Sequence, residues 1–222
     1  MSALDLLFGV RLEDGSCWGE RAEPWQIADA TAFLDLGGPR SHYWTRPRGA
    51  SKTTDAGLVC AVALVEQLPP GARAYVFAGD RDQAGLLVQA VEGARQRTDA
   101  LRGALDVQSH KLVATRTGAV IEVYASDDAS SWGLRPHIIV ASEFVAWPDT
   151  PGSKRLWRSL FSALPKVPTS RLLIETNSGD PAHFAHDVLS RARGQAGRWR
   201  VSEVPGPCPW ISAADLGKLH RL

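Results

Sequence analysis

The apolar positions of the chain follow two different spacings that alternate along the sequence. Short, unbroken apolar runs are typical of strands buried on both faces of a sheet, whereas apolar residues three and four positions apart predict helices. The predicted strands cover residues 73–79, 137–142, 171–176 and 199–204, with two more within 110–126. The predicted helices cover residues 53–68, 80–97, 153–164 and 180–193. Strands alternating with helices predict an α/β fold, with a mostly parallel central sheet and helices on both of its faces.

Turn and capping residues support these boundaries. Pro69-Pro70 cannot continue the first helix, and Asp80 is suited to cap the start of the second. Thr117-Gly118 predicts the turn of a hairpin, and Pro181 is expected in the first turn of the last helix. Ligands of parallel sheets bind where loops leave the carboxyl ends of the strands. The polar stretches that follow strands are therefore the candidates for a functional site.

Composition sets broad limits on the kind of protein. The 222 residues, 44% of them apolar, are enough for one domain with its own core. The net charge of +1 predicts no general affinity for nucleic acid or for a membrane surface. No run approaches the roughly 20 apolar residues of a membrane span, and no signal peptide is recognisable. Cys17, Cys60 and Cys208 are widely spaced, which argues against disulfides or a zinc cluster and suits a reducing cytoplasm.

The first candidate stretch is RPRGASKTT at residues 46–54, a variant of the phosphate-binding pattern G-x-x-x-x-G-K-[ST]. Arg46 and Ser51 stand where the two glycines belong, while Lys52 and Thr53 are in place. A lysine there reaches the outer phosphates, and the following hydroxyl binds Mg²⁺. Gly49 keeps one point of close approach, and we expect Ser51 to fit only if its φ need not be positive. A solvated basic turn before a helix is the alternative.

Two further stretches end buried strands, so we expect them at the same edge of the sheet. Glu143 follows an apolar run and is placed to orient and deprotonate a water that attacks a γ-phosphate. Ser142 stands where an Asp normally helps to hold Mg²⁺, and it adds no charge. Thr176 and Asn177 end the next strand and could sense the γ-phosphate. The alternatives are a solvent-facing glutamate and a loop that caps the next helix.

Arginines and one aromatic pair complete the set of candidates. Arg46 and Arg48 could pair with a γ-phosphate, and Arg135 could be an arginine finger or only a loop residue that bonds to backbone carbonyls. Trp25 could stack on a base, and the Gln26 amide could read the edge of an adenine. The alternative for this pair is the buried start of a helix at Pro24.

In their order along the chain, these stretches resemble the ATPase domain of a phage terminase large subunit, the motor that pumps DNA into an empty capsid. The resemblance covers about residues 25–181. Besides the arginine-introduced loop, it rests on YVFAGDRDQAGLLVQAV, on the run VYASDDASSWGLRPHIIVASE and on ALPKVPTSRLLIETNSGDP. It implies a P-loop NTPase fold of the ASCE or RecA-like class, and it identifies the loop as a divergent Walker A motif.

The resemblance also implies roles for the candidates. ATP would be bound by Trp25, Gln26, Gly49, Ala50, Ser51, Lys52, Thr53 and Thr54. Catalysis would involve Lys52, Glu143, Arg46, Arg48 and Arg135. Thr53 and Ser142 would lie at the Mg²⁺, and Thr176 and Asn177 would couple hydrolysis to DNA movement. The implied partners are double-stranded DNA, the portal protein, the small terminase subunit and further copies of the chain in a ring, in the cytoplasm of a bacterial host.

The resemblance extends to the domain boundaries. We expect an ATPase domain over residues 1–205 and the start of a linker toward a nuclease domain over 206–222. The chain would then be a fragment, a split gene or a decayed prophage copy. Two alternatives stay open, a helicase-like ATPase and a nucleotide-binding remnant that has lost hydrolysis because Ser142 lacks a carboxylate.

Overall fold

The computed structural model describes residues 1–125 and 133–210, and within them eight strands form one sheet. The spatial order is β3-β4-β5-β2-β6-β7-β1-β8, in which the strands from β5 to β8 are parallel and the β3-β4 hairpin is antiparallel. The strands are β1 Ser41–Thr45, β2 Arg73–Ala78, β3 Leu105–Gln108, β4 Lys111–Ala114, β5 Val120–Ala125, β6 Ile138–Ser142, β7 Arg171–Thr176 and β8 Trp199–Glu203. The predicted mostly parallel sheet is confirmed.

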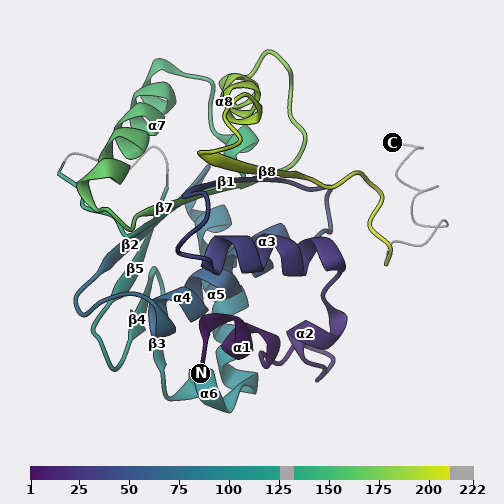
Figure 1. Cartoon of the computed structure of the whole chain (residues 1–222), viewed down its shortest axis with the longest axis vertical. Coiled ribbons are helices and arrows are strands. Elements are labelled where there is room, and N and C mark those ends of the chain that lie inside the picture. Colours follow the sequence, from purple (N-terminus) through teal and green to yellow (C-terminus); the bar gives the residue numbers. More distant parts are fainter. Residues whose placement is uncertain (126–132, 211–222) are drawn as a thin grey trace.

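Helices cover both faces of this sheet, as predicted (Figure 1). One face carries α1, α3, α4 and α5 over a core that includes Trp44, Val140 and Leu173. The other face carries α7 and α8 over a core that includes Ile139 and Ile174. The α-helices are α1 Ala3–Phe8, α2 Trp18–Arg21, α3 Pro24–Leu34, α4 Lys52–Glu66, α5 Arg81–Arg97, α6 Asp99–Arg102, α7 Pro151–Ala163 and α8 Phe184–Arg193. The 3₁₀ turns are η1 Phe144–Ala146 and η2 Leu164–Lys166.

Helix α4 is the central helix of the larger core. Every residue from Asp55 to Val65 is buried, because sheet, α5 and the N-terminal helices surround it. Gly57 allows the close approach of α5, since an added Cβ would lie 3.1 Å from Val91 and 3.2 Å from Leu87. This packing fixes where the first turn of α4 points, and with it the loop that precedes the helix.

One predicted detail is wrong, and the edge strand next to the predicted hairpin was not predicted. The last helix begins at Phe184 and is capped by the His183 side chain, so Pro181 lies in the turn before it rather than in its first turn. The hairpin has a third strand, β3, which the polar sequence LDVQ did not indicate because it lies at the sheet edge and is only partly buried.

The carboxyl ends of β1, β6 and β7 meet at one edge of the sheet. Strand β7 lies between the other two, with Thr176 paired in register with Thr45 of β1 and Glu175 paired with Ser142 of β6. Side chains of residues paired in this way point to the same face of a sheet. The expectation that the three polar stretches share an edge is therefore confirmed. Part of the acidic run before Gly133 and most of the predicted linker lie outside the described residues.

Candidate functional site

The loop between β1 and α4 carries two residues with left-handed backbone. Gly49 has φ of +77° and Ser51 has φ of +50°. The condition under which serine was expected to replace glycine is therefore not met, and Ser51 adopts a conformation that costs a non-glycine residue roughly 1–2 kcal/mol. Strain of this kind persists where the surrounding structure enforces it, often at functional sites. Because Ser51 makes no side-chain capping bond, the N–H groups of the first turn of α4 are not capped by it and can serve an anion.

Lys52 and Glu143 meet although they lie far apart in the sequence. The Lys52 ammonium lies 3.3 Å from Oε1 of Glu143 in a largely buried ion pair. Asn177, which follows β7, donates from Nδ2 to the other carboxylate oxygen of Glu143 at 3.2 Å. Glu143 itself has φ of +45°, so its backbone is strained like that of Ser51. Three segments thus hold one lysine and one carboxylate together at the loop.

A second carboxylate lies deeper at the same edge, and the sequence did not single it out. Glu175 is fully buried; its Oε1 accepts a hydrogen bond from the Ser142 hydroxyl at 2.5 Å and lies 3.4 Å from Oγ1 of Thr53. Burial, and next the charge of Glu143, raise the pKa of Glu175 to about 7. The signal that could have revealed it is an ionisable residue within RLLIET, a run whose other side chains are all buried.

Thr176 lies next to this cluster but serves a different contact. Its hydroxyl accepts a hydrogen bond from the backbone N–H of Val145 at 3.0 Å, and its side chain is almost completely buried. Val145 belongs to η1, two residues after Glu143. The end of β7 is therefore tied directly to the segment that carries Glu143.

Arg46 does not face the loop in this structure, which departs from its predicted phosphate contact. Its guanidinium is buried and pairs with Asp55 at 2.7 Å and with Asp29 at 2.9 Å. It also lies over the rings of Trp25 and Trp44, 4.5 and 4.6 Å from their centroids. Burial raises the pKa of Asp55, and the charge of Arg46 opposes that rise. The physical reason is that an unpaired buried carboxylate is costly, and Arg46 pairs with two of them, whereas the loop is not a buried charge that requires a cation. Arg48, by contrast, is exposed.

The Gln26 amide is likewise occupied within the protein. Its nitrogen donates to Asp55 at 2.7 Å, and its oxygen accepts from the backbone N–H of Glu23 at 2.9 Å. The paired donor and acceptor expected for an adenine edge are therefore both used. Trp25 is half-buried between Arg46 and Trp210, and its ring lies 6.3 Å from that of Trp210. The helix start at Pro24, part of the alternative raised for this pair, is confirmed, whereas Trp25 is not in the core, because its side chain is only half-buried.

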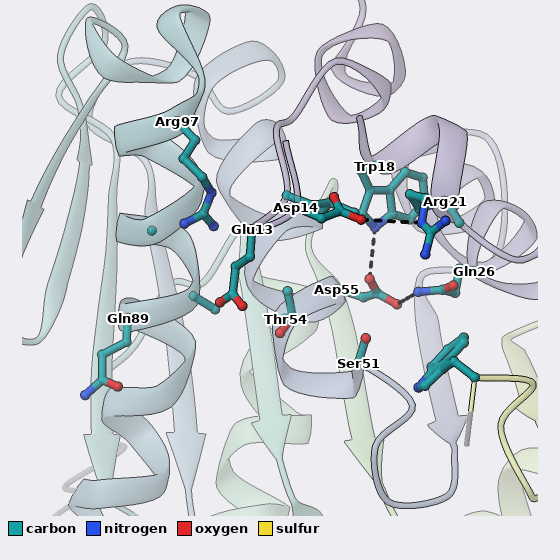
Figure 2. A pocket seen from close by; sticks show the side chains of 15 residues that line it. Glu13, Asp14, Trp18, Arg21, Gln26, Ser51, Thr54, Asp55, Gln89 and Arg97 are labelled. Carbon is teal, nitrogen blue, oxygen red and sulfur yellow. Dashed lines mark hydrogen bonds and ion pairs between the residues drawn. The ribbon is translucent and has the colours of Figure 1, made fainter. Parts of the chain in front are cut away.

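A cavity of about 600 Å³ adjoins the first turn of α4. Figure 2 shows Ser51, Thr54 and Asp55 of this turn together with Gln89 and Arg97 of α5 around it. The other lining residues come from residues 12–22, from Gln26 of α3, from further positions on α5, and from Trp210. The indole N–H of Trp210 donates to the Gly49 carbonyl at 2.9 Å. Lys52 and Glu143 do not line the cavity. Its volume is in the range of small-molecule sites, so it could take the base of a nucleotide whose phosphates lie in the loop.

The site therefore consists of a strained loop before a helix, a lysine that opens the helix, a carboxylate at the end of β6, and a polar residue that follows β7. The family model described as "Terminase large subunit, ATPase domain" matches residues 39–191, more than half of the chain. The chain belongs to this family. The resemblance noted from the sequence motifs is thereby confirmed, and the sequence matches none of the curated proteins searched.

Solved structures of large terminases share this fold. The large terminase of bacteriophage HK97 superposes with a TM-score of 0.83 at 13% identity, over 100% of this chain and 51% of its own. The large terminase of a thermophilic bacteriophage, solved in complex with ADP, gives 0.68 at 12% identity, over 90% and 50%. The ATPase domain of the Thermus phage P74-26 large terminase gives 0.61 at 13% identity, over 90% and 83%. This chain spans about half the length of the first two of these large terminases, and the P-loop fold class is confirmed.

Two further observations complete the description of this terminase domain. Arg135, the candidate finger, is exposed in the segment before β6. Among the described residues, no helix combines the length and the apolar content that a membrane crossing needs.

Proposed function

We propose that this terminase domain binds ATP at the loop between β1 and α4 and hydrolyses it. The observation that carries the proposal is the meeting of Lys52, Glu143 and Asn177 at that loop. These residue types suit the reaction, because a cation must receive the outer phosphates and a base must orient and deprotonate the attacking water. Relatives of the same fold have been solved with ADP and with ATP-gamma-S, which supports a nucleotide as the ligand.

In this proposal, residues at different positions of the site bind the phosphates, activate the attacking water and contact the base. The N–H groups that open α4 and the Lys52 ammonium would hold the phosphates. Glu143 would accept the proton of the attacking water, and the amide of Asn177 would keep its carboxylate in one orientation. Arg48, exposed on the loop, replaces Arg46 as the loop arginine available to a γ-phosphate. Trp25 and the cavity beside Ser51 and Thr54 would lie near the base.

Mg²⁺ is the metal that the reaction requires, and the residues fit it. Bound there, it would supply positive charge to offset the negative charge of the phosphates. Thr53 offers a hydroxyl beside the Glu175 carboxylate, whose Oε2 is buried without a hydrogen-bond partner. Within the described part of the chain no three His, Cys, Asp or Glu side chains form a ligand group. Mg²⁺ needs no such group, since it typically keeps waters and phosphate oxygens and takes one or two carboxylates.

The work done by hydrolysis would be the movement of double-stranded DNA. In this proposal Thr176 transmits the state of the site, because it joins the end of β7 to the segment after Glu143. A ring of copies on the portal protein, together with the small terminase subunit, would act in the host cytoplasm, and Arg135 would reach a neighbouring copy. Family membership and the exposed position of Arg135 support this part of the proposal.

The test compares two variants of the site with a remote lysine variant. Lys52→Ala should lower the affinity for a fluorescent ATP analogue about 10- to 100-fold, because a charge-assisted contact is lost. Glu143→Gln should bind within about threefold of the wild type and lose about 10²- to 10⁴-fold in kcat, the usual contribution of a general base. Lys166→Ala, exposed on η2, should change neither. Unchanged hydrolysis in Glu143→Gln would remove the assignment of the base.

Ser142 also supports a second candidate, a nucleotide-binding module without hydrolysis. Its hydroxyl is engaged by Glu175 and supplies no charge for a metal. ATP binding without measurable turnover in the wild type, with turnover gained in Ser142→Asp, would favour that function over the motor.

A further inference from the structure

The buried edge of the site contains a carboxylate with no cation of its own. Glu175 is completely buried, and among the described residues it takes part in no ion pair. The nearest candidate, Lys52, is paired with Glu143 instead. Buried charges in proteins are normally paired or bound to a metal. A glutamate on the strand between β1 and β6 therefore needs an explanation that the fold alone does not give.

The two oxygens of Glu175 have different surroundings. Oε1 accepts from the Ser142 hydroxyl at 2.5 Å and lies 3.4 Å from Oγ1 of Thr53. Oε2 is buried and has no hydrogen-bond partner. An unpartnered buried oxygen of this kind is costly, because it has lost its water and gained nothing in return. The other oxygen of the same carboxylate, Oε1, lies next to the Thr53 hydroxyl. That hydroxyl is the group that P-loop proteins offer to Mg²⁺, so a metal ion is the partner that fits Oε2.

Register explains how Glu175 comes to this place. Ser142 ends β6, where a P-loop NTPase normally carries the aspartate that holds Mg²⁺. Glu175 is its direct partner on β7, so both side chains point to the same face, toward α4. The carboxylate is moved one strand closer to β1, and the longer glutamate side chain reaches the same Thr53 hydroxyl.

We propose that Glu175 supplies the carboxylate for the Mg²⁺ that accompanies the nucleotide, in place of the acidic residue that Ser142 lacks. This inference rests on the proposed function, since the metal arrives with the phosphates. Ser142 would then act as a positioning residue that holds Oε1 of Glu175, while Oε2, which has no hydrogen-bond partner, would be available to the metal.

The experiment measures metal binding directly, without turnover. Binding of Mn²⁺ to the full chain in the presence of ADP is followed by electron paramagnetic resonance, and binding of ADP without metal by calorimetry. Glu175→Gln keeps the shape of the side chain and removes its charge. It should weaken Mn²⁺ binding by about tenfold or more. Removing a residue that only supports a metal ligand already costs about tenfold, and the loss of the ligand itself should cost at least as much. Its affinity for ADP without metal should stay within about threefold of the wild type. An ionised carboxylate only accepts hydrogen bonds and therefore donates none to the phosphate oxygens.

The matched control is Glu122→Gln, a strand glutamate on β5, two strands away from β6. It should leave both affinities unchanged. The second variant moves the carboxylate back, as Ser142→Asp with Glu175→Ser, and should recover Mn²⁺ affinity to within about threefold of the wild type. If Glu175→Gln does not fold, as shown by its thermal melt, this double variant decides the question.

Three results would overturn the inference. Mn²⁺ affinity of Glu175→Gln within twofold of the wild type would show that the carboxylate does not meet the metal. An equal fall in metal-bound and metal-free ADP affinity would make Glu175 a structural residue of the site. A folded double variant without Mn²⁺ binding would show that the position of the carboxylate is not interchangeable between the strands. A wild type that binds no nucleotide would instead defeat the proposed function itself.

Discussion

Arg46 offers the sharpest test of how the structure assigns its residues, because the sequence and the structure give it opposite roles. As a catalytic arginine it would contribute to turnover and little to stability. As the structure places it, the guanidinium joins Asp29 and Asp55 in a fully buried cluster and stacks on two tryptophan rings. We therefore predict that Arg46→Ala is a stability variant.

The expected size follows from what the substitution leaves behind. Breaking a buried ion pair by removing one partner costs about 3–5 kcal/mol. Asp29 would keep Arg200 at 3.2 Å and Ser202 at 2.9 Å, and Asp55 would keep Trp18 and Gln26. These remaining bonds limit the loss, whereas the lost cation–π contacts add to it. We expect a decrease of about 3–5 kcal/mol in the free energy of unfolding, which lowers Tm by roughly 6–20 °C in a domain of this size.

The pH dependence gives a second, independent readout. Burial raises the pKa of Asp55, and Arg46 opposes that rise more than any other neighbour. Without Arg46 this pKa should rise further. A carboxyl with a raised folded pKa contributes stability at low pH and loses it as pH increases through that pKa. The deficit of Arg46→Ala relative to the wild type should therefore be smaller at pH 5 than at pH 8.

The measurement is urea unfolding of the wild type, Arg46→Ala and Arg48→Ala at both pH values. Arg48 is the matched control, because it lies two residues away in the same loop but is exposed. Arg48→Ala should stay within about 0.5 kcal/mol of the wild type. A loss below about 1 kcal/mol in Arg46→Ala would refute the reasoning, since it would show that the buried pairs contribute little.

Two other predictions concern the loop and the core. Ser51→Gly should leave stability unchanged or raise it by up to about 1 kcal/mol, because relief of the left-handed backbone offsets the added freedom of the unfolded chain; a loss above about 1 kcal/mol in urea unfolding would contradict the strain at φ of +50°. Burial lowers the pKa of His42 to about 4, so the unfolded state takes up a proton before the folded state does as pH falls. Wild-type stability should therefore fall by up to about 3 kcal/mol between pH 6.5 and 4 on account of His42. In His42→Leu this contribution should be absent, and equal pH slopes for the two proteins would show that His42 titrates normally.

The sequence predicted best what depends on local pattern. The buried strands β6 and β7 were recognisable because each contains a run of consecutive apolar residues, and every residue of both strands is buried in the structure. The meeting of Lys52 and Glu143 was predictable because the carboxyl ends of parallel strands share one edge. The loop was recognisable by its lysine and threonine, although its glycine pattern is incomplete.

The sequence could not reveal which side chains form hydrogen bonds and ion pairs with one another when several possible partners come together only in the folded chain. Arg46 meets Asp29 from α3 and Asp55 from α4, and no spacing in the sequence shows that two carboxylates will be buried beside it. The hydrogen bond from the Gln26 amide to Asp55 was likewise not predictable, because the two residues meet only in the folded chain. Glu175 was treated as part of a strand, because the strand pattern gives the position of a side chain but not the charge that faces it.

The contact between Trp210 and the loop links two distant parts of the chain. After β8 the backbone passes beside Pro47 at Gly206 and reaches Gly49 through the indole of Trp210. The carbonyl that accepts this hydrogen bond belongs to a residue whose φ of +77° shapes the phosphate cradle. A displacement of the chain at Trp210 would therefore act on the loop through this hydrogen bond, and a change in the loop conformation would act on Trp210. If ATP binds in this loop as proposed, the Trp210 hydrogen bond makes the segment after β8 part of the wall of the nucleotide site.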